Sequence, residues 1–237
     1  MSQPSAYTFQ PHERPFMPGS PASPDQPAGR RLAYLLIGLL LGLTGGLQNG
    51  LLMANLPQIQ GALGLSVTEG GWILAAYYMT NACMSMLMFK VRRQFGIDGF
   101  LRSGIVVLVL ANGLQLFHAS YETELVARAL SGVVGNVLVT LSMFYLMQAV
   151  PADKRVVGVL LAMGLSQLAM PLARTISPLL MADGDVQRLF VLQFGLSLLC
   201  WGSTTWLHLP EGETVDSFEW TDLWSFTLFA GGVALLC

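Results

Sequence analysis

The chain has 237 residues, of which 53% are hydrophobic and only 11% are charged, and its mean hydropathy is +0.57. A water-soluble domain carries about 25% charged residues, so this composition excludes an ordinary soluble domain and predicts an integral membrane protein. The 12 Lys and Arg residues stand against 14 Asp and Glu residues. Because this balance lacks the basic excess that neutralises phosphates, we expect no nucleic-acid partner.

Residues 1–31 contain seven of the twelve prolines and no apolar periodicity. Because proline removes a backbone donor and the segment has no core to bury, we interpret it as a disordered, Pro-rich cytoplasmic tail. We expect no signal peptide, since the first apolar run begins only at Leu32 and is long enough to span a membrane. The first helix is therefore expected to be retained as an anchor.

Six apolar stretches meet or approach the length of about 20 residues that a helix needs to cross the hydrocarbon core. They cover residues 32–54, 70–89, 103–119, 125–150, 156–181 and 189–209. We therefore expect an all-α integral membrane fold with a six-span bundle over residues 32–209. An acidic connector at 210–222 leads to a seventh run at 223–237, which is too short to cross alone and is expected to be the truncated start of a seventh span.

The basic residues of the connectors predict the orientation, because cytoplasmic loops collect Lys and Arg. Nine of them fall in the tail and in the second and fourth connectors, whereas the alternate connectors hold only Arg188. We expect a multi-pass protein of the cell membrane with a cytoplasmic N-terminus, and the bacterial inner membrane as its location.

Three cysteines, Cys83, Cys200 and Cys237, are far apart and set in apolar sequence. This pattern supports neither a disulfide framework nor a zinc site. We expect small buried hydrophobic residues there, and we expect no cofactor and no metal in the protein.

Four local motifs resemble the first half of a major facilitator superfamily transporter, closest to the fourteen-span drug:proton antiporters. The first is Leu-Pro-x-Ile at 56–59 followed by Leu-Gly at 63–64 and Trp-Ile-Leu-Ala-Ala-Tyr at 72–77. The others are Leu-x-x-Arg-x-Leu-x-Gly-x-x-Gly at 125–135, Pro-x-x-x-Arg at 151–155 before a Gly-rich span with Pro171, and Phe-Glu-Trp at 218–220. The resemblance covers about residues 32–237. It implies the N-terminal six-helix bundle of that fold, a secondary multidrug efflux function and alternating access.

The chain also departs from the pattern of that family. The family has a gating loop after the second span, and this chain has a basic segment in its place. The candidate gating-loop residues are Lys90, Arg92, Arg93 and Gly96. Gln48 occupies the place of the usual Asp of the first span, and Arg174 lies in the fifth-span motif, where relatives have glycine.

Two arginines lie inside predicted spans, where a charge costs at least ~2.5–3.5 kcal/mol at the centre. Arg128 and Arg174 fall roughly 6–10 Å below the predicted outer surface at about 1.5 Å per residue, at much the same depth as Gln48 and Asn49. One interpretation is that Arg128 pairs with Glu124 one turn away and that Arg174 snorkels outward. The other is that both guanidiniums face the central cavity with Gln48 and Asn49 and bind substrate.

Proton coupling has few candidates in these spans, because their interiors contain no carboxylate. Within this half, it would have to use Glu122, Glu124 or His118. The polar residues Asn81, Asn136, Ser166 and Gln167 at mid-span depth favour hydrogen bonds between helices over substrate contact. Gly38, Gly42 and Gly46 repeat every four residues, which predicts close helix packing.

Three functions compete at this stage. The first is a transporter of small amphipathic or anionic compounds, present here as its N-terminal half, which needs a lipid bilayer and a missing C-terminal half or a second copy. The alternative is a non-transporting truncated membrane protein or a helix-bundle interaction partner. A membrane enzyme is not expected, because His12, His118 and His208 lie far apart and form no catalytic cluster.

Overall fold

The computed structural model describes residue 21, residues 26–117, 120–151, 154–181 and 185–210, and residues 224, 228 and 232. Side chains are not described at positions 86, 89, 91–98 and 101. Almost all of the predicted tail, the acidic connector and the seventh run lie outside these residues, so their predicted structures are not tested.

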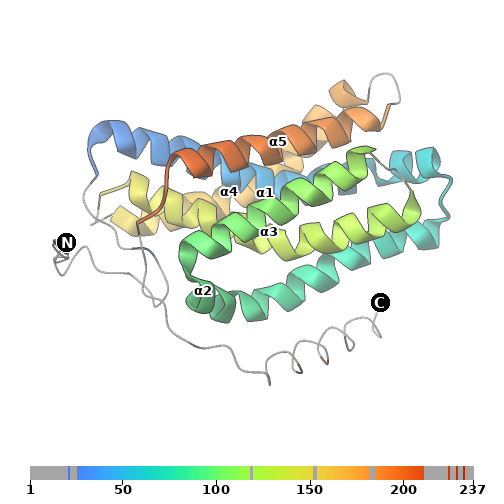
Figure 1. The fold of residues 1–237 in the computed structure, drawn as a ribbon. Coiled ribbons are helices and arrows are strands. Elements are labelled where there is room, and N and C mark those ends of the chain that lie inside the picture. The colour runs from blue at the N-terminus through green and yellow to red at the C-terminus, as the bar shows by residue number, and fades with distance from the viewer. Residues whose placement is uncertain are drawn as a thin grey trace.

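The elements of the described chain are five α-helices that pack side by side as a bundle (Figure 1). They are α1 (Ala28–Leu63), α2 (Val67–Phe117), α3 (Tyr121–Ala149), α4 (Arg155–Leu180) and α5 (Gln187–Trp206). The expected all-α fold is confirmed.

Helix α2 contains the second and third predicted spans, and its chain reverses direction between them (Figure 1). Asn81 and Met88 contact Gly132 and Thr140 of α3, so this part of α2 runs parallel to α3. Gly104 lies against Val137, and Gln115 reaches Glu124, so the later part runs antiparallel to α3. The predicted connector at 90–102 is therefore the place of the reversal, although its backbone is helical.

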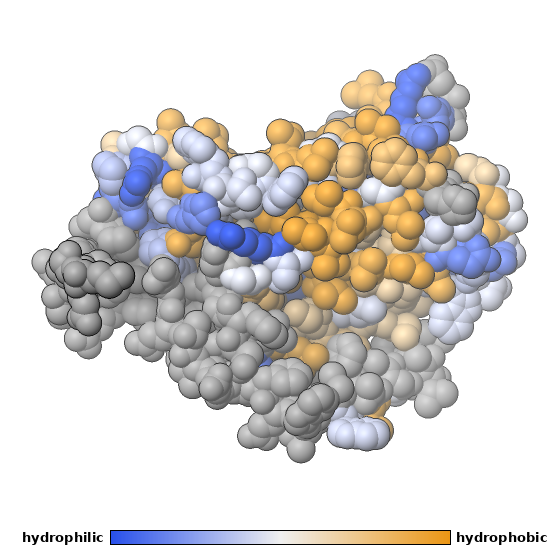
Figure 2. Space-filling view, in the orientation of Figure 1, coloured by the Kyte–Doolittle hydropathy of each residue, from blue (hydrophilic) through white to orange (hydrophobic). Residues whose placement is uncertain are grey.

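Four helices, α1, α3, α4 and α5, are long and apolar enough to cross a membrane, and Arg102–Phe117 of α2 forms a shorter apolar helix. The visible face in Figure 2 is hydrophobic over its middle, with hydrophilic residues mainly toward the two ends. A surface of this kind suits a hydrocarbon environment with polar layers at both sides.

Helices α3 and α1 form the centre of the bundle. Their most apolar segments are 72% and 61% buried, whereas that of α4 is only 22% buried. Two apolar clusters fill the interior, one around Leu41, Leu138 and Tyr145 and the other around Leu51, Ile73 and Leu189. Much of α4 is left on the surface, with Leu160, Met163 and Leu168 among its exposed side chains.

Small residues let α1 approach its neighbours closely. A Cβ at Gly38 would lie 2.7 Å from Leu146 of α3, and one at Gly42 would lie 2.6 Å from the Ser142 hydroxyl. On the α4 side Gly46 faces Ala169, and a Cβ at Gly50 would lie 3.2 Å from Ala173. The predicted close packing of the glycine repeat is confirmed. Residues four apart in α1 face residues four apart in α4, in the same order, so the two helices run parallel.

Helix α1 extends past the predicted end of the first span, to Leu63, across a kink at Asn55. Pro57 lacks the amide donor that a helix interior needs, and Asn55 takes non-helical dihedrals with φ −119° and ψ 16°. The Asn55 amide donates to the Leu51 carbonyl oxygen and to the Ser177 hydroxyl of α4, both at 2.7 Å. These bonds satisfy the backbone at the kink and tie it to α4.

Candidate functional site

A polar groove of about 240 Å³ lies where α1, the first part of α2, α3 and α4 meet. Its lining is Gly45, Gly46, Asn49, Gly50, Tyr77, Asn81, Gly135, Asn136, Val139, Ser166 and Met170. A Cβ at Gly45, Gly46 or Gly50 would meet a side chain of α3 or α4, so these glycines let the helices around the groove pack closely. The amide, phenol and hydroxyl groups come from all four helices, so a molecule in this groove would contact every helix of this face.

Two asparagines of the groove also hold α2 against α3. The Asn81 amide donates to the Gly132 carbonyl oxygen at 3.1 Å, and the Asn136 amide donates to the Asn81 carbonyl oxygen at 2.8 Å and to the Ser85 hydroxyl at 2.7 Å. Hydrogen bonds between helices were expected for these residues. The structure adds that the same side chains line the groove.

Toward the predicted extracellular end, Asn49 of the groove lining forms a hydrogen-bonded cluster with Tyr78 of α2 and Met53 of α1. The Asn49 amide donates to the Tyr78 hydroxyl oxygen at 2.9 Å, and that hydroxyl donates to the Met53 sulfur at 3.0 Å. Arg174 of α4 is exposed and lies one turn beyond Met170 of the groove lining. Residues four apart share a helix face, so Arg174 extends the groove-lining row of α4.

Arg128 lies inside the bundle and not in the groove lining. Its side chain is fully buried, and Nε donates to Glu124 Oε1 at 3.1 Å. Nη1 donates to the Gln48 carbonyl oxygen of α1 at 3.0 Å, and Nη2 donates to Gln193 Oε1 of α5 at 3.2 Å. The guanidinium thus joins three helices, and its charge is balanced by Glu124.

The environment of Glu124 and Gln48 completes this buried network. Gln115 of α2 donates from Nε2 to both carboxylate oxygens of Glu124 at 2.8 Å. Gln193 donates from Nε2 to the Gln48 carbonyl oxygen at 3.2 Å. The Gln48 side chain is 1% exposed, and its amide nitrogen and oxygen have no hydrogen-bond partner among the described residues.

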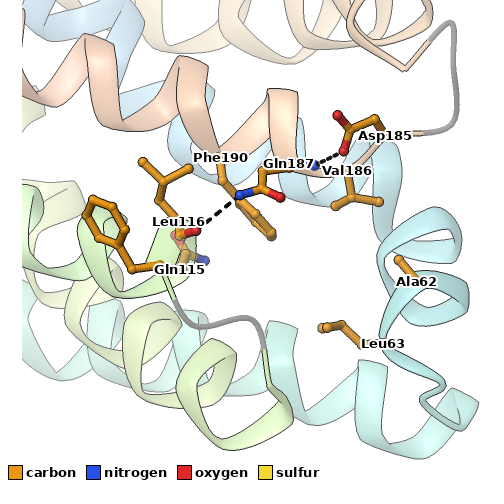
Figure 3. Close-up of a pocket in the computed structure, with 9 residues that line it drawn as sticks. Ala62, Leu63, Gln115, Leu116, Asp185, Val186, Gln187 and Phe190 are labelled. Carbon is orange, nitrogen blue, oxygen red and sulfur yellow. Dashed lines mark hydrogen bonds between the residues drawn. The ribbon is translucent and has the colours of Figure 1, made fainter.

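A second pocket, of about 440 Å³, opens at the same end, between the ends of α1 and α2 and the start of α5 (Figure 3). Gln115 and Leu116 lie on one side, and Ala62 and Leu63 lie across from them. At its α5 side the Gln187 side chain donates to the Leu116 carbonyl oxygen at 3.4 Å. Because Gln115 also contacts Glu124, the pocket ends one side chain away from the buried network.

Two exposed carboxylates stabilise the starts of helices at this end. Hydrogen bonds from the Ser66 hydroxyl and backbone N–H lower the pKa of Glu69 below 4.5. A backbone hydrogen bond at the start of α3, followed by one from the Ser120 hydroxyl, lowers the pKa of Glu122. Both groups are therefore acceptors that favour the first turns of their helices.

A sequence profile described as "Major Facilitator Superfamily" matches residues 35–235. The chain belongs to this family. Because the family consists of membrane transporters, its members are carriers and not enzymes. The resemblance to the first half of the drug:proton antiporters is confirmed.

Several curated relatives carry names that refer to resistance or to multidrug export. The chain is 25% identical over 185 residues to the fatty acid resistance protein FarB of Neisseria gonorrhoeae, covering 76% of this chain and 35% of FarB. It is 24% identical to the putative multidrug resistance protein MdtD of Escherichia coli O6:H1, covering 76% and 38%. It is also 24% identical to the multidrug export protein EmrB of Haemophilus influenzae, covering 81% and 36%. The chain therefore spans about a third of the length of these relatives.

The structure separates the four predicted substrate residues. Asn49 lies in the groove lining, and Arg174 lies on the same face of α4. Gln48 and Arg128 lie behind this face, and Arg128 has the Glu124 pair that was one of its two interpretations. Of the predicted gating loop, Lys90 has at least one interaction partner, and the side chains of Arg92 and Arg93 and the surroundings of Gly96 lie outside the described set.

Sequence reasoning missed Asn112, Gln115 and Gln193. All three are buried in the network, and the Asn112 amide donates to the Gln193 carbonyl oxygen at 3.2 Å. A signal was available, because each is a polar residue within a predicted apolar span. Polar groups in a membrane interior are costly and therefore mark helix contacts or function.

Two of the three cysteines lie in the described residues. Cys83 and Cys200 are free and buried, as expected; Cys237 is outside the described set. No cluster of three or more His, Cys, Asp or Glu side chains that could hold a metal is found in the part of the chain that the structure describes.

Proposed function

We propose that this chain is the N-terminal half of a secondary transporter that exports small amphipathic or anionic compounds by alternating access. The polar groove carries this proposal. It is lined from four helices, and transporters of this kind bind substrate between two bundles near the bilayer midplane. Family membership supports transport, and relatives named for multidrug export and multidrug resistance support the direction outward.

The second bundle is part of the proposal. The curated relatives are almost three times as long as the matched segment, and α4 presents exposed apolar side chains beside the groove. A second six-helix bundle, carried by the remainder of a longer chain or by a second copy, would cover this face and close the groove. The resulting protein would lie in the cell membrane with the N-terminus inside.

The chemistry of the groove supports the substrate class. Tyr77 and Met170 offer apolar surface, Asn49 and Asn81 offer amides, and Arg174 offers an exposed cation on the same face. An amphipathic molecule with a negative or electron-rich end would satisfy both parts. One relative is named for fatty acid resistance, and a fatty acid is an anionic amphiphile.

Replacement of Arg174 tests the substrate site. With oleate as the anionic probe, Arg174→Gln should lower efflux roughly ten- to hundredfold, because a charge-assisted hydrogen bond contributes about 1.5–3 kcal/mol. Arg174→Lys should restore only part of it, since an ammonium cannot bind a carboxylate through two parallel hydrogen bonds.

The matched control is Arg188→Gln, which removes another exposed arginine from the same end of the bundle. It should leave oleate efflux and protein abundance unchanged. Wild-type efflux by Arg174→Gln, or a loss that follows protein abundance alone, would contradict the proposed role and leave Arg174 as a side chain that snorkels to the membrane surface.

The proposed orientation is tested with single cysteines in a background without native cysteines. Ser66→Cys, at the exposed start of α2, should react with an impermeant maleimide added outside intact cells. Lys154→Cys, at the start of α4, should react only after the inner face is made accessible. The reverse pattern would place the N-terminus outside.

A further inference from the structure

Glu124 is the acidic residue that is buried in the part of the chain that the structure describes, at 2% exposure. It lies in the first turn of α3 and accepts hydrogen bonds from two side chains, Arg128 and Gln115. A carboxylate away from water is costly unless it is paired and hydrogen-bonded. The position therefore requires an explanation beyond helix capping, which an exposed carboxylate such as Glu122 provides equally well.

Arg128 does not depend on Glu124 alone. Two of its nitrogens donate to the Gln48 carbonyl oxygen and to Gln193 Oε1. If Glu124 became neutral, these two acceptors on α1 and α5 would still hold the guanidinium in place. The geometry thus accommodates both charge states of the carboxyl group without rebuilding the interior.

The Gln115 side chain can also accommodate both charge states of Glu124. Its Nε2 donates to both oxygens of Glu124, whereas its Oε1 is buried and has no hydrogen-bond partner among the described residues. An amide has donors on one side and an acceptor on the other. Rotation of the amide by half a turn would turn Oε1 toward Glu124, where it could accept from a protonated carboxyl group.

An access route leads from the surface to Gln115. This side chain is part of the wall of the pocket of about 440 Å³ in Figure 3, together with Asp185, Val186 and Phe190. The pocket is large enough for water, and Gln115 separates it from Glu124 by one hydrogen bond. A proton from the predicted extracellular side could therefore reach the carboxylate without crossing the apolar core.

We propose that Glu124 is a proton-binding site, loaded through this pocket, and that Gln115 is the positioning residue that serves both of its protonation states. A hydronium ion in the pocket transfers a proton to one carboxylate oxygen: one O–H bond of the hydronium breaks, the O–H bond of the carboxylic acid forms, and a water molecule is left. The Glu124–Arg128 pair thereby changes from neutral to a net charge of +1. The proposal rests on the proposed transport function for its purpose, since a bound proton could couple the bundle to a proton gradient.

The charges around this site are few in the described residues. Arg128 lies on the same helix, the Tyr77 hydroxyl of α2 lies within electrostatic reach of Arg128, and α1 and α5 contribute uncharged amides from Gln48 and Gln193. Asp185 and its partner Arg188 lie at the pocket, at the start of α5. Protonation of Glu124 would therefore change the charge balance of a region that otherwise holds one buried cation.

Infrared titration of the full chain in liposomes tests the site without a substrate. On acidification, the wild type should gain a carboxylic-acid C=O band characteristic of an acid shielded from water. Glu124→Gln should lose this band, and Glu122→Gln, which removes an exposed carboxyl group two residues away, should keep it. Gln115→Leu should keep the band and shift it to higher frequency, because the protonated acid loses its acceptor.

The proposal is overturned if Glu124→Gln and the wild type give the same acid bands over the pH range in which circular dichroism finds the helices intact. A transport assay then separates this inference from the proposed function. In vesicles with an imposed pH gradient, Glu124→Gln should lose proton-driven oleate transport at least tenfold but retain exchange of internal for external oleate. If the wild type shows neither proton-driven transport nor exchange, transport of this probe is contradicted. The infrared result then still decides whether Glu124 binds a proton.

Discussion

Replacement of Arg128 by leucine tests whether the buried network is the main polar support of the bundle. The substitution removes hydrogen bonds to Glu124, to the Gln48 carbonyl oxygen and to Gln193. It leaves Glu124 buried, with Gln115 as the side chain of another helix that still donates to it among the described residues. Removing one partner of a buried ion pair costs about 3–5 kcal/mol, and we expect the free energy of unfolding to fall by that amount.

A second substitution separates the loss of charge balance from the loss of contacts. Glu124→Gln in the Arg128→Leu background removes the uncompensated charge, so the double variant should be more stable than Arg128→Leu alone. Arg188→Leu is the control, because its ion pair with Asp185 is 3.9 Å long and half exposed on both sides. Exposed pairs of this kind contribute less than about 1 kcal/mol.

The measurement is unfolding by sodium dodecyl sulfate in mixed micelles, followed by far-ultraviolet circular dichroism. The reasoning fails if Arg128→Leu is as stable as Arg188→Leu. It fails equally if adding Glu124→Gln lowers stability further, because the carboxylate would then have contributed favourably without its cation.

Two further predictions concern packing and the surface. Gly46→Val should lower the free energy of unfolding by about 1–3 kcal/mol, because a Cβ at this position meets Ala169, whereas Gly61→Ala, with nothing within 4 Å of its Cβ, should not lower it. The folded-state pKa of Glu69 lies below 4.5 because Ser66 hydrogen-bonds its carboxylate, so its contribution to stability is complete at neutral pH and is lost as the pH falls through that folded-state pKa. Carbon-13 NMR titration of labelled glutamate should give Glu69 a lower pKa than the same residue has in Ser66→Ala.

The number and order of the apolar segments could be predicted from hydropathy, but the ends of the helices could not. The first span was expected to end at residue 54, and α1 continues to Leu63 because the kink at Asn55 is held by Ser177 of α4, a residue far away in sequence. Helix α1 ends at the C-cap residue Gly64, whose φ of 65° is a left-handed conformation that glycine adopts at low cost. Hydropathy records which residues tolerate lipid and carries no information about such caps.

The candidate site was predictable only where it depends on spacing along one helix. Glu124 and Arg128 are four residues apart, and this spacing places them on one face of α3. Their other partners, Gln115 and Gln193, come from helices whose rotation about their own axes is set by packing. The groove likewise depends on α1 and α4 meeting through glycine and alanine, which fixes the direction of Asn49.

The two arginines of the spans, predicted at the same depth, differ in what balances their charge, and this difference bears on coupling. Arg128 is neutralised by Glu124, so the cation that extends the groove face is Arg174. Arg128 is separated from the groove by little more than α1, since Gln48 accepts its hydrogen bond and the next residue, Asn49, lines the groove. A proton on Glu124 would leave the charge of Arg128 unbalanced just behind the groove. That charge disfavours a bound cation and favours a bound anion. The sign of the effect of pH on binding would therefore report the charge of the substrate.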